Sequence, residues 1–248
     1  QQLIQSQRRL LHDVSHELRS PLARMQAAIG LMRQNPARGE QMFERMERET
    51  QRLDELVGEI LTLARLEEDK GHGDMVEIDL DDLVADIVAD ATFEGLEKNL
   101  RIVIEGAVDT PIIGLPNLLH RSIENLVRNA VKYTKPNTTI DVTVERRHDK
   151  VAIGVADRGP GIAADQLIDV LDPFVRLPQS EHETTNGSNA EARSVSGFGL
   201  GLAITKRAVA LHQGELTLAN REGGGLHAVI TLAIKPLGRA PSRVKHAH

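Results

Sequence analysis

An imidazole, a carboxylate and a hydroxyl lie within five consecutive residues near the beginning of the sequence. They are His16, Glu17 and Ser20, in the stretch His-Glu-Leu-Arg-Ser-Pro-Leu. A neutral imidazole is a nucleophile, and a carboxylate that accepts its N–H fixes the tautomer and leaves the other ring nitrogen free to attack. On a helix, Ser20 would share a face with His16. The stretch therefore indicates a nucleophilic histidine, although a lone histidine on a helix is more often a solvated surface residue.

Four further polar side chains recur at intervals of three and four residues. They are Asn125, Asn129, Lys132 and Tyr133. On a helix these residues share one face. The amide oxygen of Asn129 is a hard, neutral ligand that suits Mg²⁺, and Lys132 offers a point charge for phosphate. Taken alone, this spacing is equally compatible with an ordinary polar helix face.

A carboxylate followed by glycines marks the end of an apolar stretch, 151–156. Asp157 is followed at close spacing by Gly159 and Gly161. A carboxylate at a strand end, beside bare backbone, could accept a hydrogen bond from an adenine amino group. Glycine and proline also favour a plain turn at this position, so the motif by itself leaves both interpretations open.

A second glycine-rich stretch opens a predicted helix. Its residues are Gly197, Phe198, Gly199, Leu200, Gly201 and Leu202. Glycines ahead of a helix N-terminus allow backbone amides to approach phosphate groups. A polar loop rather than a strand precedes the stretch, which argues against a dinucleotide-binding fold.

The histidine stretch must lie on a helix that packs against other helices. Apolar residues recur there in steps of three and four, at Val14, Leu18, Leu22, Met25, Ile29 and Met32. This pattern predicts a helix over 1–33, kinked or loosened near Pro21, and a second amphipathic helix over 40–68. A hairpin buries one stripe per helix, so we expect two copies to form a dimeric four-helix bundle. The alternative is a hairpin that packs on the downstream domain.

The remainder of the chain mixes helix and strand and predicts a separate α+β domain. The expected organisation is a hairpin over 1–69, a linker over 70–75, the mixed domain over 76–236 and a disordered tail over 237–248. The expected helices are 81–99, 115–134, 163–171 and 200–212, and the expected strands are 76–79, 101–105, 111–114, 139–147, 150–157, 215–220 and 226–234. Residues 178–196 contain almost nothing to bury, which is typical of a lid or a disordered loop.

Composition excludes several classes of protein. The net charge of −6 argues against a general nucleic-acid binder, and the absence of cysteine excludes disulfides and thiolate chemistry. No apolar run approaches the roughly 18 residues that a membrane helix needs. Because Gln1 opens directly into helix-like sequence, we expect that the chain is cut from a longer protein.

Together and in this order, the motifs resemble those of bacterial two-component sensor histidine kinases. The His16 stretch resembles their phosphoacceptor box, and the later motifs resemble their N box, first glycine box, F box and second glycine box. Arg176 belongs to the F box, Asp-Pro-Phe-Val-Arg, at 172–176. By inspection the boxes are nearest to the CpxA-like branch of the family. The resemblance implies a dimeric hairpin bundle followed by an α/β-sandwich ATP-binding domain of the Bergerat type.

The resemblance also implies an activity. ATP and Mg²⁺ would bind at the four later boxes, His16 would accept the γ-phosphoryl group, and an aspartate of a response regulator would receive it next. Ser20 stands where the family often has Thr or Asn, and the resemblance implies that it helps to position water for dephosphorylation of the regulator. The alternative is that its hydroxyl bonds back to the carbonyl of His16, four residues earlier. The missing N-terminal part would be a sensor region that anchors the protein at the cytoplasmic face of the bacterial inner membrane.

Two rival functions use the same nucleotide-binding pattern. One is an ATP-hydrolysing machine that resembles gyrase and Hsp90 chaperones, which have a Glu base where this chain has Asn125. The other is a dimeric scaffold that binds nucleotide without catalysis, and the intact pair of His16 and Glu17 argues against it. The spacing leaves open whether His16 is phosphorylated within one protomer or between two.

Overall fold

The structure is a computed structural model that describes residues 2–67, 74–177 and 197–234. It divides into two compact units, one formed by Gln1–Lys70 and Ile168–Ile204 and the other by Gly71–Leu167 and Thr205–His248. The expected linker, the polar loop over 178–196 and the expected tail lie outside the described residues, except for Asp74 and Met75 of the linker.

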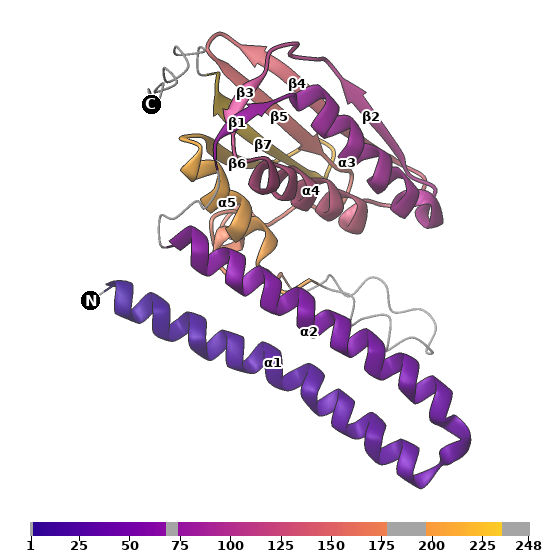
Figure 1. Cartoon of the computed structure of the whole chain (residues 1–248). Helices are drawn as coiled ribbons and strands as arrows, with labels where there is room; N and C mark the ends of the chain where they lie inside the picture. Colours follow the sequence, from indigo (N-terminus) through magenta and orange to yellow (C-terminus); the bar gives the residue numbers. More distant parts are fainter. Residues whose placement is uncertain (1, 68–73, 178–196, 235–248) are drawn as a thin grey trace, which may run out of the picture. The chain divides into compact units, whose positions relative to one another are not determined.

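Two long helices form the hairpin of the first unit. Helix α1 covers Gln2–Gln34, a 3-10 turn covers Pro36–Arg38, and α2 covers Gly39–Glu67. The helices run side by side in opposite directions (Figure 1). Pro21 lies inside α1, where it cannot donate to the carbonyl of Glu17, yet the helix continues without a break. The predicted hairpin is therefore confirmed, and the loosened turn expected at Pro21 does not end the helix.

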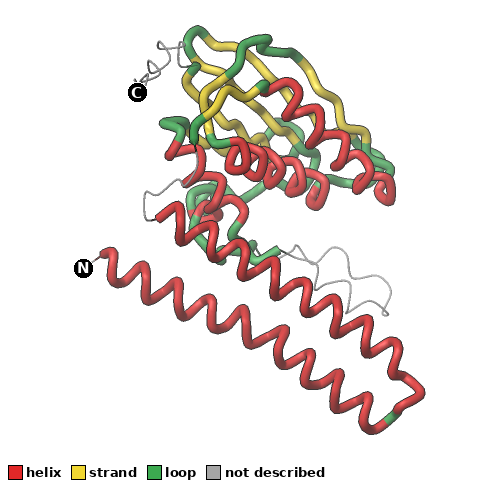
Figure 2. Tube along the Cα trace, in the orientation of Figure 1, coloured by secondary structure: helices red, strands yellow, loops and turns green. Residues whose placement is uncertain are grey.

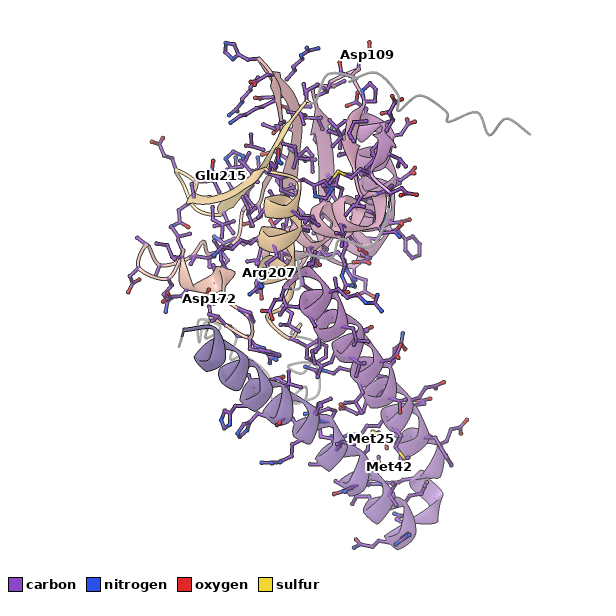
Figure 3. The ribbon with its side chains drawn as sticks, turned by 60° about the vertical axis from the view of Figure 1, so that its left-hand side comes forward. Met25, Met42, Asp109, Asp172, Arg207 and Glu215 are labelled. Atoms are coloured by element: carbon purple, nitrogen blue, oxygen red, sulfur yellow. The ribbon has the colours of Figure 1, made fainter. Side chains whose placement is uncertain are left out.

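Packing within the hairpin is confined to one stripe of each helix. Met25 of α1 and Met42 of α2 lie in the space between the helices (Figure 3). Leu56 and Leu63 of α2 are fully buried. Several large apolar side chains of the same two helices stay exposed: Leu22, Leu31, Phe43, Val57 and Leu61. Much apolar surface of the hairpin thus has no cover within the described part of one chain.

One ion pair ties the two helices together. The guanidinium of Arg24 donates from Nε to Oε1 of Glu49 over 2.6 Å and from Nη2 to Oε2 over 2.8 Å. Glu49 is only 7% exposed. The hydrogen bond from Arg24 lowers the pKa of Glu49, and the bond to Glu49 raises the pKa of Arg24, both against the opposing effect of burial. Removing one partner of a fully buried ion pair lowers the free energy of unfolding by about 3–5 kcal/mol. Because Arg24 is partly exposed, the loss of Arg24 or Glu49 should cost less than this.

This pair predicts an acid-sensitive hairpin. A carboxyl whose pKa is lower in the folded state stabilises the fold above its unfolded pKa, near the ordinary 4.5, and the stabilisation is lost as pH falls through the folded value. We expect the midpoint of thermal unfolding, followed by circular dichroism, to fall more steeply below about pH 4.5 in the parent protein than in Glu49→Gln. Identical profiles for the two proteins would show that Glu49 does not contribute.

The second unit is built on a five-stranded mixed sheet with the order β2-β4-β5-β7-β6. The strands are β2 Arg101–Glu105, β4 Thr139–Arg147, β5 Lys150–Ala156, β6 Glu215–Asn220 and β7 Leu226–Ala233. The β2–β4 pair is parallel and the other pairs are antiparallel. A separate antiparallel pair joins β1 Val76–Ile78 to β3 Ile112–Gly114. The predicted mixture of helix and strand is confirmed.

Helices cover one face of this sheet, shown in yellow in Figure 2. They are α3 Leu80–Glu94, α4 Pro116–Tyr133 and the part of α5 Gly201–Leu211 that begins at Thr205. The core between helices and sheet consists of aliphatic side chains that are at most 2% exposed: Val84, Ile87, Leu119, Ile123, Ile140, Ile153 and Ile230. A core of this kind accommodates the low aromatic content, and it fixes α4 against β5, whose end bears Asp157.

Two predicted helices are shorter than expected. The helix expected over 163–171 is reduced to turns and a 3-10 helix at Asp169–Leu171. Ile168 is 76% exposed, and Pro173 holds Asp172 in an extended conformation that ends the segment. The helix expected over 81–99 ends at Glu94, because Gly95 begins a 3-10 turn that closes at Asn99 with a positive φ of 51°.

Candidate nucleotide-binding and phosphoacceptor sites

Asp157 is a buried carboxylate with one oxygen still available. It is 7% exposed, and Oδ1 accepts hydrogen bonds from the backbone N–H groups of Gly159 at 2.7 Å and Leu226 at 3.1 Å. Among the described residues, no contact is given for Oδ2. Burial raises the pKa of Asp157, and the two backbone hydrogen bonds and the charge of Arg221 oppose that rise. A carboxylate oxygen without a partner among the described residues is an acceptor that a ligand amino group would satisfy.

The backbone around Asp157 is packed too closely for side chains. A Cβ on Gly159 would lie 2.5 Å from the carbonyl oxygen of Tyr133, the last residue of α4. Gly161 has a positive φ of 73°. Gly225, with a φ of 104°, lies against the backbone of Asp157 itself. The first glycine stretch therefore needs its glycines for close approach to α4 and to Asn220 at the end of β6, which the sequence motif alone could not distinguish from a plain turn.

The four polar residues of α4 are held to different degrees. Nδ2 of Asn125 donates to Oγ1 of Thr205 on α5 over 3.4 Å. Asn129 is half-buried. The Nζ atom of Lys132 lies 4.8 Å from the ring centroid of Tyr133, and Tyr133 is 44% exposed. The end of α4 thus brings a cation and a phenol ring to the turn that holds Gly159.

Three residues that the sequence motifs did not indicate support this corner. Oγ1 of the buried Thr134 accepts from the backbone N–H of Arg158 over 3.0 Å. Arg221 donates to the carbonyl of Asp157 over 3.1 Å. Lys98 donates to the last carbonyls of α4. Thr134 directly follows the polar face of α4, so its place in the sequence was a usable signal, whereas the contacts of Lys98 and Arg221 depend on the tertiary fold.

The second glycine stretch and the F box lie against each other in the first unit. The N–H of Phe174 donates to the carbonyl of Gly199 over 3.0 Å. Gly199 has a φ of 77°, and a Cβ there would lie 2.7 Å from the carbonyl oxygen of Val175. Leu200 is fully buried, so its side chain belongs to the core, whereas a Cβ on Gly197 would meet nothing within 4 Å. Gly201 and Leu202 begin α5, and both are half-exposed.

The phosphoacceptor candidate is an exposed side chain of α1. The ring centroid of His16 lies 4.6 Å from that of His12, one turn earlier, in an edge-to-face arrangement. The contact given for Glu17 is with Arg176, whose Nη2 lies 2.5 Å from Oε2. The hydroxyl of Ser20 accepts from Nη1 of Arg24 over 2.5 Å. His16 and Ser20 share one face as predicted, and the described contacts do not include a bond between Glu17 and His16.

The described residues contain no group of three or more His, Asp or Glu side chains arranged to hold a metal ion. Within residues 2–67, 74–177 and 197–234, no helix combines the length and apolar character that crossing a bilayer requires.

Two family patterns match this chain. Residues 6–69 match the His Kinase A (phospho-acceptor) domain, and residues 114–236 match the Histidine kinase-, DNA gyrase B-, and HSP90-like ATPase. The first match contains His16, Glu17 and Ser20. The second contains both glycine stretches and the polar face of α4.

Individual relatives and solved structures agree. Sensor histidine kinase CpxA of Escherichia coli K12 is 32% identical over 235 residues, which are 94% of this chain and 48% of CpxA. Sensor-like histidine kinase SenX3 of Mycolicibacterium smegmatis is 30% identical over 92% of this chain and 57% of SenX3. This chain thus spans about half the length of these relatives.

The fold is that of solved histidine kinases. Histidine kinase AdeS of Acinetobacter baumannii superposes with a TM-score of 0.69 at 19% identity, over 89% of this chain and 98% of AdeS. Histidine kinase ThkA, solved in complex with response regulator protein TrrA, gives a TM-score of 0.71 at 22% identity, over 93% of this chain and 63% of ThkA. With a phosphoacceptor hairpin followed by the ATPase domain, the chain belongs to the sensor histidine kinases.

Proposed function

We propose that this chain is the catalytic core of a sensor kinase that phosphorylates its own His16 from Mg²⁺–ATP and passes the phosphoryl group to an aspartate of a response regulator. The observation that carries the proposal is the combination of an exposed His16 on α1 with a buried Asp157 whose Oδ2 has no described partner. The first is a nucleophile open to a large partner. The second is an acceptor suited to the amino group of adenine.

The residues of the nucleotide site fit ATP and Mg²⁺. Asp157 would accept from the adenine amino group, while Gly159 and Gly161 keep the backbone beside it bare. Lys132, Tyr133 and Asn125 would contact phosphates or the metal, and Arg176 would add charge from the F box. The backbone amides of the second glycine stretch would face phosphate oxygens. Asn129 would hold Mg²⁺, which neutralises phosphate charge when it is bound.

Replacing Asn129 by Asp should impair the use of Mg²⁺–ATP. The change adds a negative charge and removes an N–H donor at the proposed metal ligand, so we expect a slower phosphorylation rate and an altered dependence on Mg²⁺ concentration. The matched control is Asn117→Asp, the same change at an exposed position in the first turn of the same helix. Equal rates and equal Mg²⁺ dependence in the parent and Asn129→Asp would remove Asn129 from the site.

The phosphoryl transfer needs few groups from the protein. A ring nitrogen of His16 forms the bond to the γ-phosphorus as the bond from phosphorus to the bridging oxygen breaks and ADP leaves. Glu17 would accept the N–H of the other ring nitrogen, which requires that it exchange its contact with Arg176 for one with His16. Positioning and charge neutralisation supply most of the remaining catalysis.

We further propose that the chain acts as a homodimer and as part of a longer protein at the cytoplasmic face of the inner membrane. The exposed Leu22, Leu31, Phe43, Val57 and Leu61 of the hairpin support a four-helix bundle, which would cover them. The solved complex of ThkA with TrrA supports a response regulator as the partner. The membrane anchor would belong to a sensor region outside this chain.

A hydrolytic machine is the weaker alternative. It would need a general base beside Asn125, and the neighbouring Glu124 instead lies 3.8 Å from Arg128, in an ion pair between exposed side chains. The test is to label the protein with ATP, remove the nucleotide and add purified receiver domains. Our proposal expects the label to move to a receiver domain, and labelled free phosphate formed without any phosphoprotein would favour the machine.

A further inference from the structure

We infer that Arg24, held in place by Glu49, is a positioning residue that orients the hydroxyl of Ser20 for dephosphorylation of the partner regulator. The inference rests on the proposed function, because it assigns the pair a part in a phosphatase activity of the same hairpin toward the phosphorylated regulator. It concerns residues of α1 and α2 whose contacts all lie within the first unit.

One guanidinium makes all three hydrogen bonds of this arrangement. Nε and Nη2 of Arg24 donate to the two carboxylate oxygens of Glu49, at 2.6 and 2.8 Å, and Nη1 donates to Oγ of Ser20 at 2.5 Å. The guanidinium is planar, so a two-point contact with a carboxylate fixes its orientation. Glu49 is itself buried, which makes it a rigid support on the opposite helix. The direction of the third N–H toward Ser20 is therefore set by the packing of α1 against α2.

This contact determines what the Ser20 hydroxyl can still do. Arginine donates and never accepts, so it occupies one lone pair of Oγ and leaves the other lone pair and the O–H proton for other partners. The contact given for Ser20 is with Arg24 and not with the carbonyl of His16, the local alternative for a helical serine. Ser20 is exposed on the face that bears His16. The free lone pair and proton are therefore available to a water molecule on that face.

A serine hydroxyl depends more on a neighbouring side chain for its orientation than a threonine hydroxyl does. It lacks the methyl group that restricts χ1 in threonine, so its hydroxyl is less preorganised by its own side chain. In the phosphatase step, the oxygen of a water molecule bonds to phosphorus as the acyl–phosphate bond breaks. The products are the aspartate carboxylate, inorganic phosphate and a proton released to solvent. A hydroxyl fixed by Arg24 would hold that water in line.

The alternative is that the pair merely stabilises the hairpin. Four proteins separate the two roles: the parent, Arg24→Gln, Ser20→Thr and the double variant. Decay of phosphorylated regulator in the presence of ADP measures the phosphatase activity, and autophosphorylation of His16 measures the kinase activity. We expect Arg24→Gln to lower the phosphatase rate on the order of 10- to 100-fold while autophosphorylation stays within about twofold of the parent.

The second readout compares the effect of Arg24→Gln on the phosphatase rate with Ser and with Thr at position 20. Because Ser20→Thr restores part of the preorganisation within the side chain, we expect it to make the loss caused by Arg24→Gln several-fold smaller. The charge-swapped protein, Arg24→Glu with Glu49→Arg, controls for stability. We expect it to keep the melting temperature of the hairpin but not the phosphatase activity, because a carboxylate cannot donate to Ser20.

Three outcomes would overturn the inference. They are an equal loss of both activities in Arg24→Gln, an equal effect of Arg24→Gln with Ser and with Thr at position 20, and full phosphatase activity in the charge-swapped protein. Each differs from a failure of the proposed function, in which the parent protein itself would neither label His16 nor dephosphorylate a regulator.

Discussion

Replacing His16 by Gln is expected to reduce autophosphorylation below detection while ATP binding stays close to that of the parent. Glutamine keeps a polar side chain of similar length but has no nucleophilic nitrogen. His16 is exposed on α1, and none of its described contacts involves a residue of the nucleotide boxes, so its loss should leave the ATP site intact. The measurement pairs transfer of label from γ-labelled ATP with the affinity for a fluorescent ATP analogue.

The matched control is His12→Gln, which changes the neighbouring histidine of the same helix. Its ring lies 4.6 Å from that of His16 between centroids, so the control also shows whether this contact matters. We expect His12→Gln to retain phosphorylation. If acid-labile label persisted in His16→Gln and disappeared in His12→Gln, the phosphoacceptor would be His12 and not His16.

Replacing Asp157 by Asn is expected to weaken ATP binding without unfolding the protein. The Oδ1 acceptor that serves Gly159 and Leu226 is retained, while the free Oδ2 acceptor becomes an N–H donor that faces the donor of adenine. An unsatisfied buried polar group costs about 1–3 kcal/mol, which corresponds to roughly 5- to 150-fold in affinity. Isothermal titration with ATP measures this loss, and Asp165→Asn, at an exposed position, is the control.

Asp157→Asn should weaken ATP binding without lowering the stability of the ligand-free protein. Measuring the stability therefore shows whether weaker binding comes from the lost acceptor or from misfolding. Burial raises the pKa of Asp157, so between the ordinary value of 3.8 and the raised value the folded state binds the proton more tightly than the unfolded chain. Stability therefore falls as pH rises through this window, and the cost is fully present above it. We expect ligand-free Asp157→Asn to melt no lower than the parent at neutral pH. A melting temperature several degrees lower would mean that the loss of binding reflects misfolding.

The sequence predicted the elements of this fold well where periodicity was strong. The 3- and 4-residue steps of the hairpin and the apolar run that ends at Asp157 correspond to α1, α2 and β5. It failed at 163–171, where only Asp169–Leu171 forms a short 3-10 helix and Ile168 stays exposed. Local pattern does not report whether a tertiary surface is available to cover a helix.

The candidate sites divide in a similar way. Asp157 and the glycines were found from residue type and spacing. The backbone at Gly161 and Gly199 has a positive φ and is crowded, so these positions require glycine, which is visible in the sequence. The partners of Glu17 and Arg24 were not found. Arg176 lies 159 residues from Glu17 and Glu49 lies 25 residues from Arg24, and neither separation carries a periodic signal. Only the folded chain brings these groups together.

The most direct test of this account is to identify the atom that receives the γ-phosphoryl group. The parent protein is incubated with Mg²⁺ and γ-labelled ATP, and the label is examined for stability in acid and base and then located by mass spectrometry of peptides. We predict an acid-labile, base-stable label on the peptide that contains His16. An acid-stable label, or labelled free phosphate released without any phosphoprotein, would contradict the assignment of this chain as a histidine kinase.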